Sequence, residues 1–76
     1  MRKVTINLNS IDKVKSFCDI CSNQGFDIDV RNDRYIVNAK SIMGLFSLDL
    51  SKQLTCTFPE EYADSFLREI RNYISE

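Results

Sequence analysis

Residues 37–48 read VNAKSIMGLFSL and change from one hydrophobic spacing to another at the middle of the segment. Val37 and Ala39 alternate with polar neighbours, which is typical of a half-buried strand. Leu45 and Leu48 are three residues apart, as on one face of a helix. Ser41 is a residue type that favours the capping position before a helix. The segment therefore predicts a strand followed by a short helix that begins at Ser41.

The sequence before this segment predicts two further strands, one longer helix and the start of the strand that the segment continues. The strands are expected at 3–8, 26–30 and 34–39, and an amphipathic helix is expected over about 11–23. Gly25 ends that helix, and Asn32-Asp33 forms the turn between the second and third strands. The residues expected to face inward are Val4, Ile6, Leu8, Ile11, Val14, Phe17, Cys18, Cys21, Phe26, Ile28, Val30, Tyr35, Val37 and Ala39.

The sequence after the segment predicts a fourth strand at 53–58 and a final helix that starts near Pro59. The inward-facing residues expected there are Leu54, Cys56, Phe58, Tyr62, Ala63, Phe66, Leu67, Ile70, Tyr73 and Ile74. The element order is βαββαβα. It predicts an α+β two-layer sandwich, a four-stranded antiparallel sheet with helices packed on one face, and a single domain over residues 1–76.

Composition excludes several classes of function. Ten basic residues balance eleven acidic ones without forming a basic run, so direct binding of nucleic acid is not expected. There is no long apolar stretch for membrane insertion and no export signal, so a cytoplasmic protein is expected. The sequence contains no histidine, and we expect neither a metal site nor a cofactor.

Residues 37–48, with Lys40-Ser41-Ile42-Met43-Gly44 at their centre, resemble the third strand and short helix of HPr. HPr is the phosphocarrier protein of the bacterial sugar phosphotransferase system. The chain length and the βαββαβα order are similar to those of that family along the whole chain. The resemblance implies an HPr-like fold.

The resemblance fails at the family's phosphorylation site. HPr carries a phosphohistidine at the start of its first helix, within a motif of the form Gly-Ile-His-Ala-Arg-Pro-Ala. Alignment without gaps places Ser10 where the family has the histidine and Asp12 where it has the arginine. A phosphoserine is a stable ester, and a carboxylate at position 12 would repel a phosphoryl group. We therefore expect a degenerate carrier site, a protein that cannot carry phosphohistidine, and no enzymatic activity.

The resemblance also implies a regulatory role for Ser41. In HPr of Gram-positive bacteria the matching serine is phosphorylated by an ATP-dependent HPr kinase/phosphorylase. In the catabolite-repression HPr-like members, which also lack the histidine, this serine governs binding to a catabolite-control transcription factor. A partner-binding surface is expected beside Ser41, formed by Ile42, Met43, Phe46 and Lys40. Lys40 and the helix N-terminus would receive the phosphate.

Three alternatives remain open. Ser41 could serve only as a helix cap. Ser10 could likewise be a helix cap, with Asp12 as an acid in the first turn that suits the helix dipole. The chain could be an HPr-like interaction or assembly module unrelated to sugar transport. An enzyme would have to use Ser10 for phosphotransfer or the Cys18-Asp19-Ile20-Cys21 motif for redox chemistry. That motif lies inside a predicted helix and in phase with its apolar face, which favours buried structural thiols.

Overall fold

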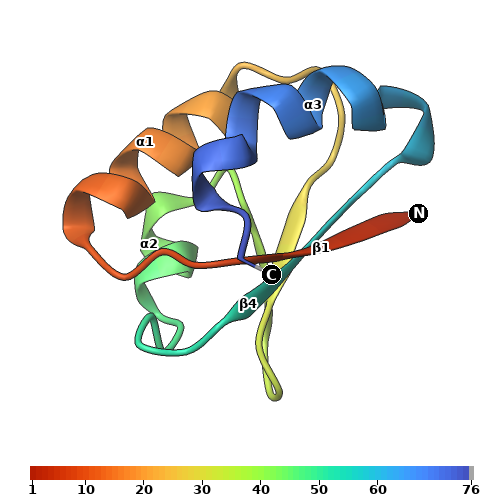
Figure 1. The fold of residues 1–76 in the computed structure, drawn as a ribbon. Helices are drawn as coiled ribbons and strands as arrows, with labels where there is room; N and C mark the ends of the chain where they lie inside the picture. The colour runs from red at the N-terminus through yellow and green to blue at the C-terminus, as the bar shows by residue number, and fades with distance from the viewer. Residues whose placement is uncertain (76) are drawn as a thin grey trace.

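The computed structural model describes residues 1–75 and follows the expected order of strands and helices (Figure 1). Two short 3-10 turns, η1 and η2, flank the last helix. The elements are β1 (Arg2–Ile6), α1 (Ile11–Ser22), β2 (Asp29–Arg31), β3 (Ile36–Asn38), α2 (Ile42–Phe46), β4 (Leu54–Phe58), η1 (Glu60–Tyr62), α3 (Ala63–Ile70) and η2 (Arg71–Tyr73).

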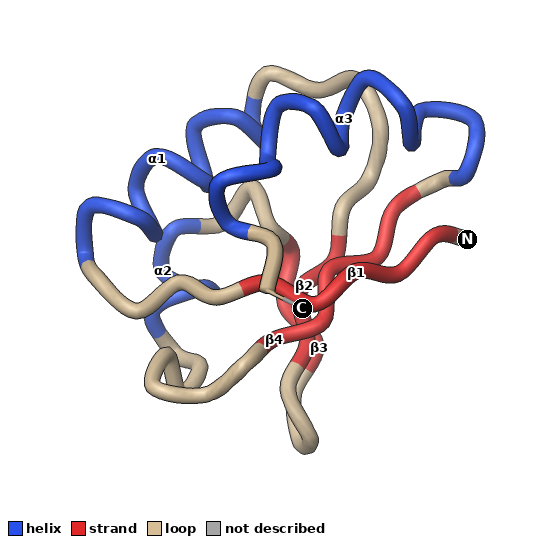
Figure 2. Tube along the Cα trace, viewed as in Figure 1, coloured by secondary structure: helices blue, strands red, loops and turns tan. Residues whose placement is uncertain are grey.

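The four strands form one antiparallel sheet in the order β1-β4-β2-β3, with the helices on one side of it (Figures 1 and 2). Helix α1 contacts both α2 and α3. The predicted α+β sandwich, with helices on one face of a four-stranded antiparallel sheet, is therefore confirmed. The C-terminal segment covers part of the free edge of β1, because Ser75 N donates to Thr5 O (2.8 Å) and Asn7 N donates to Tyr73 O (2.8 Å).

The core lies between the sheet and the helices. Cys56, at the middle of β4, is paired in register with Val4 of β1 and Val30 of β2. From the helical layer, Phe66 of α3 meets the Phe58 ring edge-to-face at 4.8 Å. Alternation along β4 and helical spacing in α1 and α3 thus direct apolar side chains into one shared cluster.

Three residues predicted to face inward are exposed instead. Ile11 is 63% exposed, because it begins α1 one turn before Val14, the first buried residue of that helix. Tyr35 is 57% exposed, because the hairpin turn that precedes β3 extends beyond the layer of helices (Figure 2). Tyr62 is 40% exposed; it lies in η1 and stacks one ring face on Phe26 at 4.3 Å.

Strand lengths also differ from the expected ones. β2 and β3 contain only three residues each, and the loop that precedes β2 carries the buried Ile28. None of the helices within residues 1–75 combines the length and the apolar character that a membrane crossing requires.

Candidate functional site

Ser41 caps the N-terminus of α2 with its side chain. Its backbone is extended (φ −100°, ψ 108°), and its Oγ accepts a hydrogen bond from Gly44 N at 3.1 Å. The residue is exposed to solvent. The cap geometry predicted from the sequence is therefore present, and the hydroxyl lies at the surface.

Gly44 allows α2 to pack closely against β3. A Cβ at this position would lie 3.2 Å from Ser41 Oγ and 3.2 Å from Val37 Cβ, closer than most side chains tolerate. Because Gly44 has no side chain, the helix can approach the sheet while Ser41 keeps its cap hydrogen bond. This contact holds the capping serine against the end of β3.

The two apolar faces of α2 have different surroundings. Leu45 is fully buried and Leu48, just after the helix, is 5% exposed, so the face that these two leucines share points into the core. Met43 is 76% exposed and Phe46 is 38% exposed. Ile42 is partly buried and packs against the core cluster. We call Ile42, Met43 and Phe46 the α2 patch.

Lys40, expected to receive a phosphate, is engaged elsewhere. Its Nζ donates to Gln24 O at 2.9 Å, just beyond the end of α1. The side chain is partly buried. The structure therefore uses Lys40 to tie the start of α2 to the segment that follows α1.

The residues predicted to form a degenerate carrier site, Ser10 and Asp12, make ordinary helix-starting interactions. Ser10 is the N-cap of α1, and its Oγ accepts from Lys13 N at 3.2 Å. Asp12 lies exposed in the first turn, where its carboxylate suits the positive end of the helix. The hydroxyl of Ser10 is thus engaged in capping, and the sequence offers no histidine as a base.

The start of α1 adds an apolar residue that the sequence did not indicate. Ile11 is exposed and belongs to the helix that packs beside α2 (Figure 1). Helical spacing placed it on the buried face, so only its position in the first turn could have signalled exposure. The paired helices α1 and α2 therefore present Ile11 as well as the α2 patch.

The three thiols are buried. Cys21 and Cys56 are fully buried and Cys18 is 8% exposed, and none of them forms a disulfide. Burial raises the pKa of Cys56 to about 12. Burial, reinforced by the neighbouring thiols of Cys56 and Cys18, also raises the pKa of Cys21 strongly. At neutral pH these two groups stay protonated, the opposite of what a nucleophilic thiol needs.

Three solved structures that share this fold are HPr phosphocarrier proteins. HPr-C-His from Thermoanaerobacter tengcongensis is 25% identical with a TM-score of 0.78, over 95% of this chain and 89% of its own. The phosphocarrier protein HPr from Bacillus anthracis is 26% identical with a TM-score of 0.72, over 97% and 94% of the two chains.

A histidine-containing phosphocarrier protein of a mycoplasma is 15% identical with a TM-score of 0.75, over 93% of this chain and 89% of its own. At that identity the likeness concerns the fold alone. No family model and no curated protein sequence matches the chain. The structural neighbours are HPr phosphocarrier proteins, in agreement with the fold that residues 37–48 implied.

Proposed function

We propose that this chain is a regulatory binding protein with the HPr fold, which docks partner proteins through the α2 patch and is switched by phosphorylation of Ser41. The observation that carries the proposal is the exposure of Met43 and Phe46 on the helix that the exposed Ser41 caps. Exposed methionine and aromatic side chains are characteristic of docking surfaces. The likeness to HPr phosphocarriers supports this choice of surface.

The proposal excludes the carrier role that gives these relatives their name. A carrier needs a labile phosphoryl bond, and the chain has no histidine to form one. Asp12 adds a negative charge next to the Ser10 cap, which disfavours the approach of a phosphoryl donor. The chain would therefore bind partners without accepting phosphate from the relay.

Phosphorylation of Ser41 would change the charge of the docking surface. The phosphate adds about −1.5 to −2 charges at neutral pH. The amide of Gly44, which already donates to Ser41 Oγ, is near enough to donate to a phosphate oxygen. Such a charge would favour a partner that carries Arg or Lys and would weaken a purely apolar contact.

The partners that follow from this proposal are proteins of the cytoplasm. An HPr kinase/phosphorylase would modify Ser41, and a catabolite-control transcription factor would read the modified form. We expect no cofactor. An HPr-like assembly module without a link to sugar transport is the alternative, and it becomes the better description if the kinase does not recognise the chain.

We expect HPr kinase/phosphorylase with ATP to add one phosphoryl group to Ser41. Ser41 is exposed, and in its cap bond the Oγ acts only as an acceptor (3.1 Å), so the hydroxyl proton is not used there. Intact-mass spectrometry should detect the product in the wild type and not in Ser41→Ala. Ser10→Ala is the matched control, because Ser10 is also an exposed N-cap serine, and this variant should be modified like the wild type. Absence of uptake, or equal uptake by Ser41→Ala, would leave Ser41 as a cap only.

The chain should stay unlabelled when it is incubated with phosphoenolpyruvate and the first enzyme of the phosphotransferase relay. The physical reason is the missing histidine, which leaves no ring nitrogen to form the labile bond. Acid-labile phosphate would be measured on the intact chain, with a histidine-containing HPr as the positive control. Acid-labile label on this chain would refute the non-carrier assignment.

A further inference from the structure

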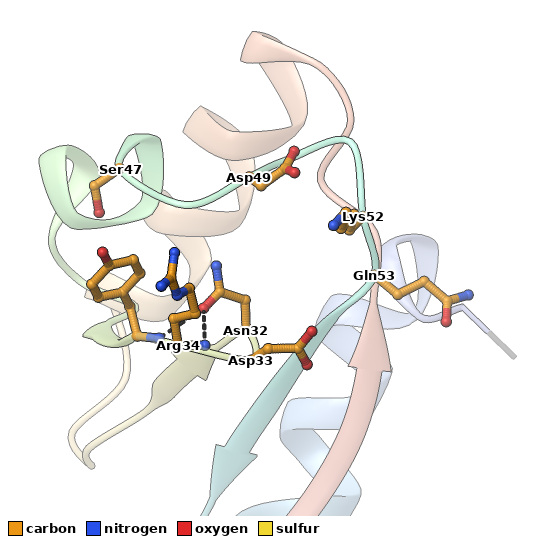
Figure 3. A pocket seen from close by; sticks show the side chains of 8 residues that line it. Asn32, Asp33, Arg34, Ser47, Asp49, Lys52 and Gln53 are labelled. Carbon is orange, nitrogen blue, oxygen red and sulfur yellow. Dashed lines mark hydrogen bonds between the residues drawn. The ribbon is translucent and has the colours of Figure 1, made fainter.

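A cleft separates two loops at the end of the molecule that carries the β2–β3 hairpin (Figure 3). One wall is the hairpin turn, residues 32–35, and the other is the connection from α2 to β4, within residues 47–53. The cleft has a volume of about 350 Å³. Its lining does not include Met43 or Phe46, so it is a separate feature from the proposed docking surface.

The hairpin wall presents hydrogen-bond donors. Asn32 Oδ1 accepts from the backbone N–H groups of Arg34 (2.9 Å) and Tyr35 (2.8 Å). These two bonds fix the orientation of the side-chain amide. Its nitrogen is then the atom that can donate a hydrogen bond to a ligand in the cleft. Figure 3 shows this nitrogen and the Arg34 guanidinium on the side of the hairpin that faces the opposite loop. Donors grouped in this way suit a carboxylate.

The opposite wall holds a fixed negative charge. Asp49 Oδ1 accepts from Ser51 N at 3.1 Å and from Ser51 Oγ at 2.6 Å. The hydrogen bonds from Ser51, side chain first, lower the pKa of Asp49, which is therefore ionised at neutral pH. Every hydrogen bond found on this carboxylate within residues 1–75 ends on Oδ1, so Oδ2 remains for a donor from a ligand.

The charges that line the cleft cancel but do not pair. Arg34 and Lys52 line the cleft together with Asp33 and Asp49, a net charge of zero. Within residues 1–75 the one ion pair shorter than 4.0 Å joins Arg2 to Glu60, outside the cleft. A simple anion would meet two carboxylates, and a simple cation would meet Arg34 and Lys52. A ligand that carries both charges satisfies both sets of groups.

We propose that this cleft binds a free α-amino acid in its zwitterionic form. The carboxylate of the ligand lies against Arg34 and the Asn32 amide, and its ammonium lies toward Asp49. The ring of Tyr35, which lines the same cleft and is 57% exposed, offers an apolar surface to the ligand side chain.

The test is a titration of the ¹⁵N-labelled protein followed by backbone amide chemical shifts. L-phenylalanine and L-serine are the probes, and we expect at least one to shift the amides of residues 32–35 and 47–53 in a saturable way. N-acetyl-L-phenylalanine lacks the ammonium group and L-phenylalanine amide lacks the carboxylate, so both should bind at least about tenfold more weakly.

Arg34→Gln should also weaken binding about tenfold, because it removes a charge-assisted hydrogen bond. Arg68→Gln replaces another exposed arginine, on α3; it is the matched control and should bind like the wild type. The proposal is overturned if neither amino acid shifts these amides, if the N-acetyl form binds as tightly as the free amino acid, or if Arg34→Gln and Arg68→Gln behave alike.

Discussion

Phe66→Ala should lower the free energy of unfolding by about 3–5 kcal/mol, the range for removing a buried aromatic ring. The Phe66 side chain is fully buried and packs edge-to-face on Phe58 at 4.8 Å and on Phe26 at 5.6 Å. A domain of this length has a free energy of unfolding of about 4–11 kcal/mol, so the substitution removes a large part of the stability. Chemical denaturation followed by circular dichroism measures the change.

Phe46→Ala is the matched control, since it removes the same side chain from a position that is 38% exposed. Its cost should be smaller, about 1–2 kcal/mol, because the side chain is only partly buried there. If Phe66→Ala does not fold, Phe66→Leu gives a measurable intermediate value. Equal losses for Phe66→Ala and Phe46→Ala would show that the assignment of core and surface aromatics is wrong.

The periodic parts of the chain were predictable from the sequence because their spacing reports burial directly. Leu54, Cys56 and Phe58 alternate along β4, and all three are buried. Cys18 and Cys21 share the phase of the apolar face of α1, and they lie in the core. Where another layer covers an element along its whole length, the spacing of the apolar residues predicts which side chains are buried.

The ends of elements were not predictable in this way. Ile11 and Tyr35 have the correct phase for burial, but both side chains are more than half exposed in the structure. Periodicity indicates the direction of a side chain along an element. It does not indicate how far the neighbouring layer extends, which depends on the packing of the whole chain.

The site was predictable only in its local part. The cap of Ser41 on Gly44 spans three residues and follows from residue type. The bond from Lys40 to Gln24 O spans 16 residues and has no sequence signal. The cleft between residues 32–35 and 47–53 is equally non-local, because the fold brings together two loops that have no common pattern.

Met43→Glu should weaken the interaction with HPr kinase/phosphorylase at least about tenfold, a change of about 1.4 kcal/mol or more. The side chain is 76% exposed, so the substitution should leave the fold intact. In a docked complex the new carboxylate would be buried against an apolar partner surface without a matching charge. Desolvation of an unpaired charge is costly, which makes this exposed residue a sensitive probe of the α2 patch.

The measurement is the kcat/KM for phosphorylation of Ser41, together with the dissociation constant of the unphosphorylated protein for the kinase. Ile36→Glu is the matched control: Ile36 is an apolar residue, 62% exposed, on β3. Its neighbour Val37 faces α2, so Ile36 points to the other side of the sheet. We expect Ile36→Glu to remain within about twofold of the wild type. If both variants lose affinity equally, or if neither does, partners dock elsewhere and the α2 patch has another purpose.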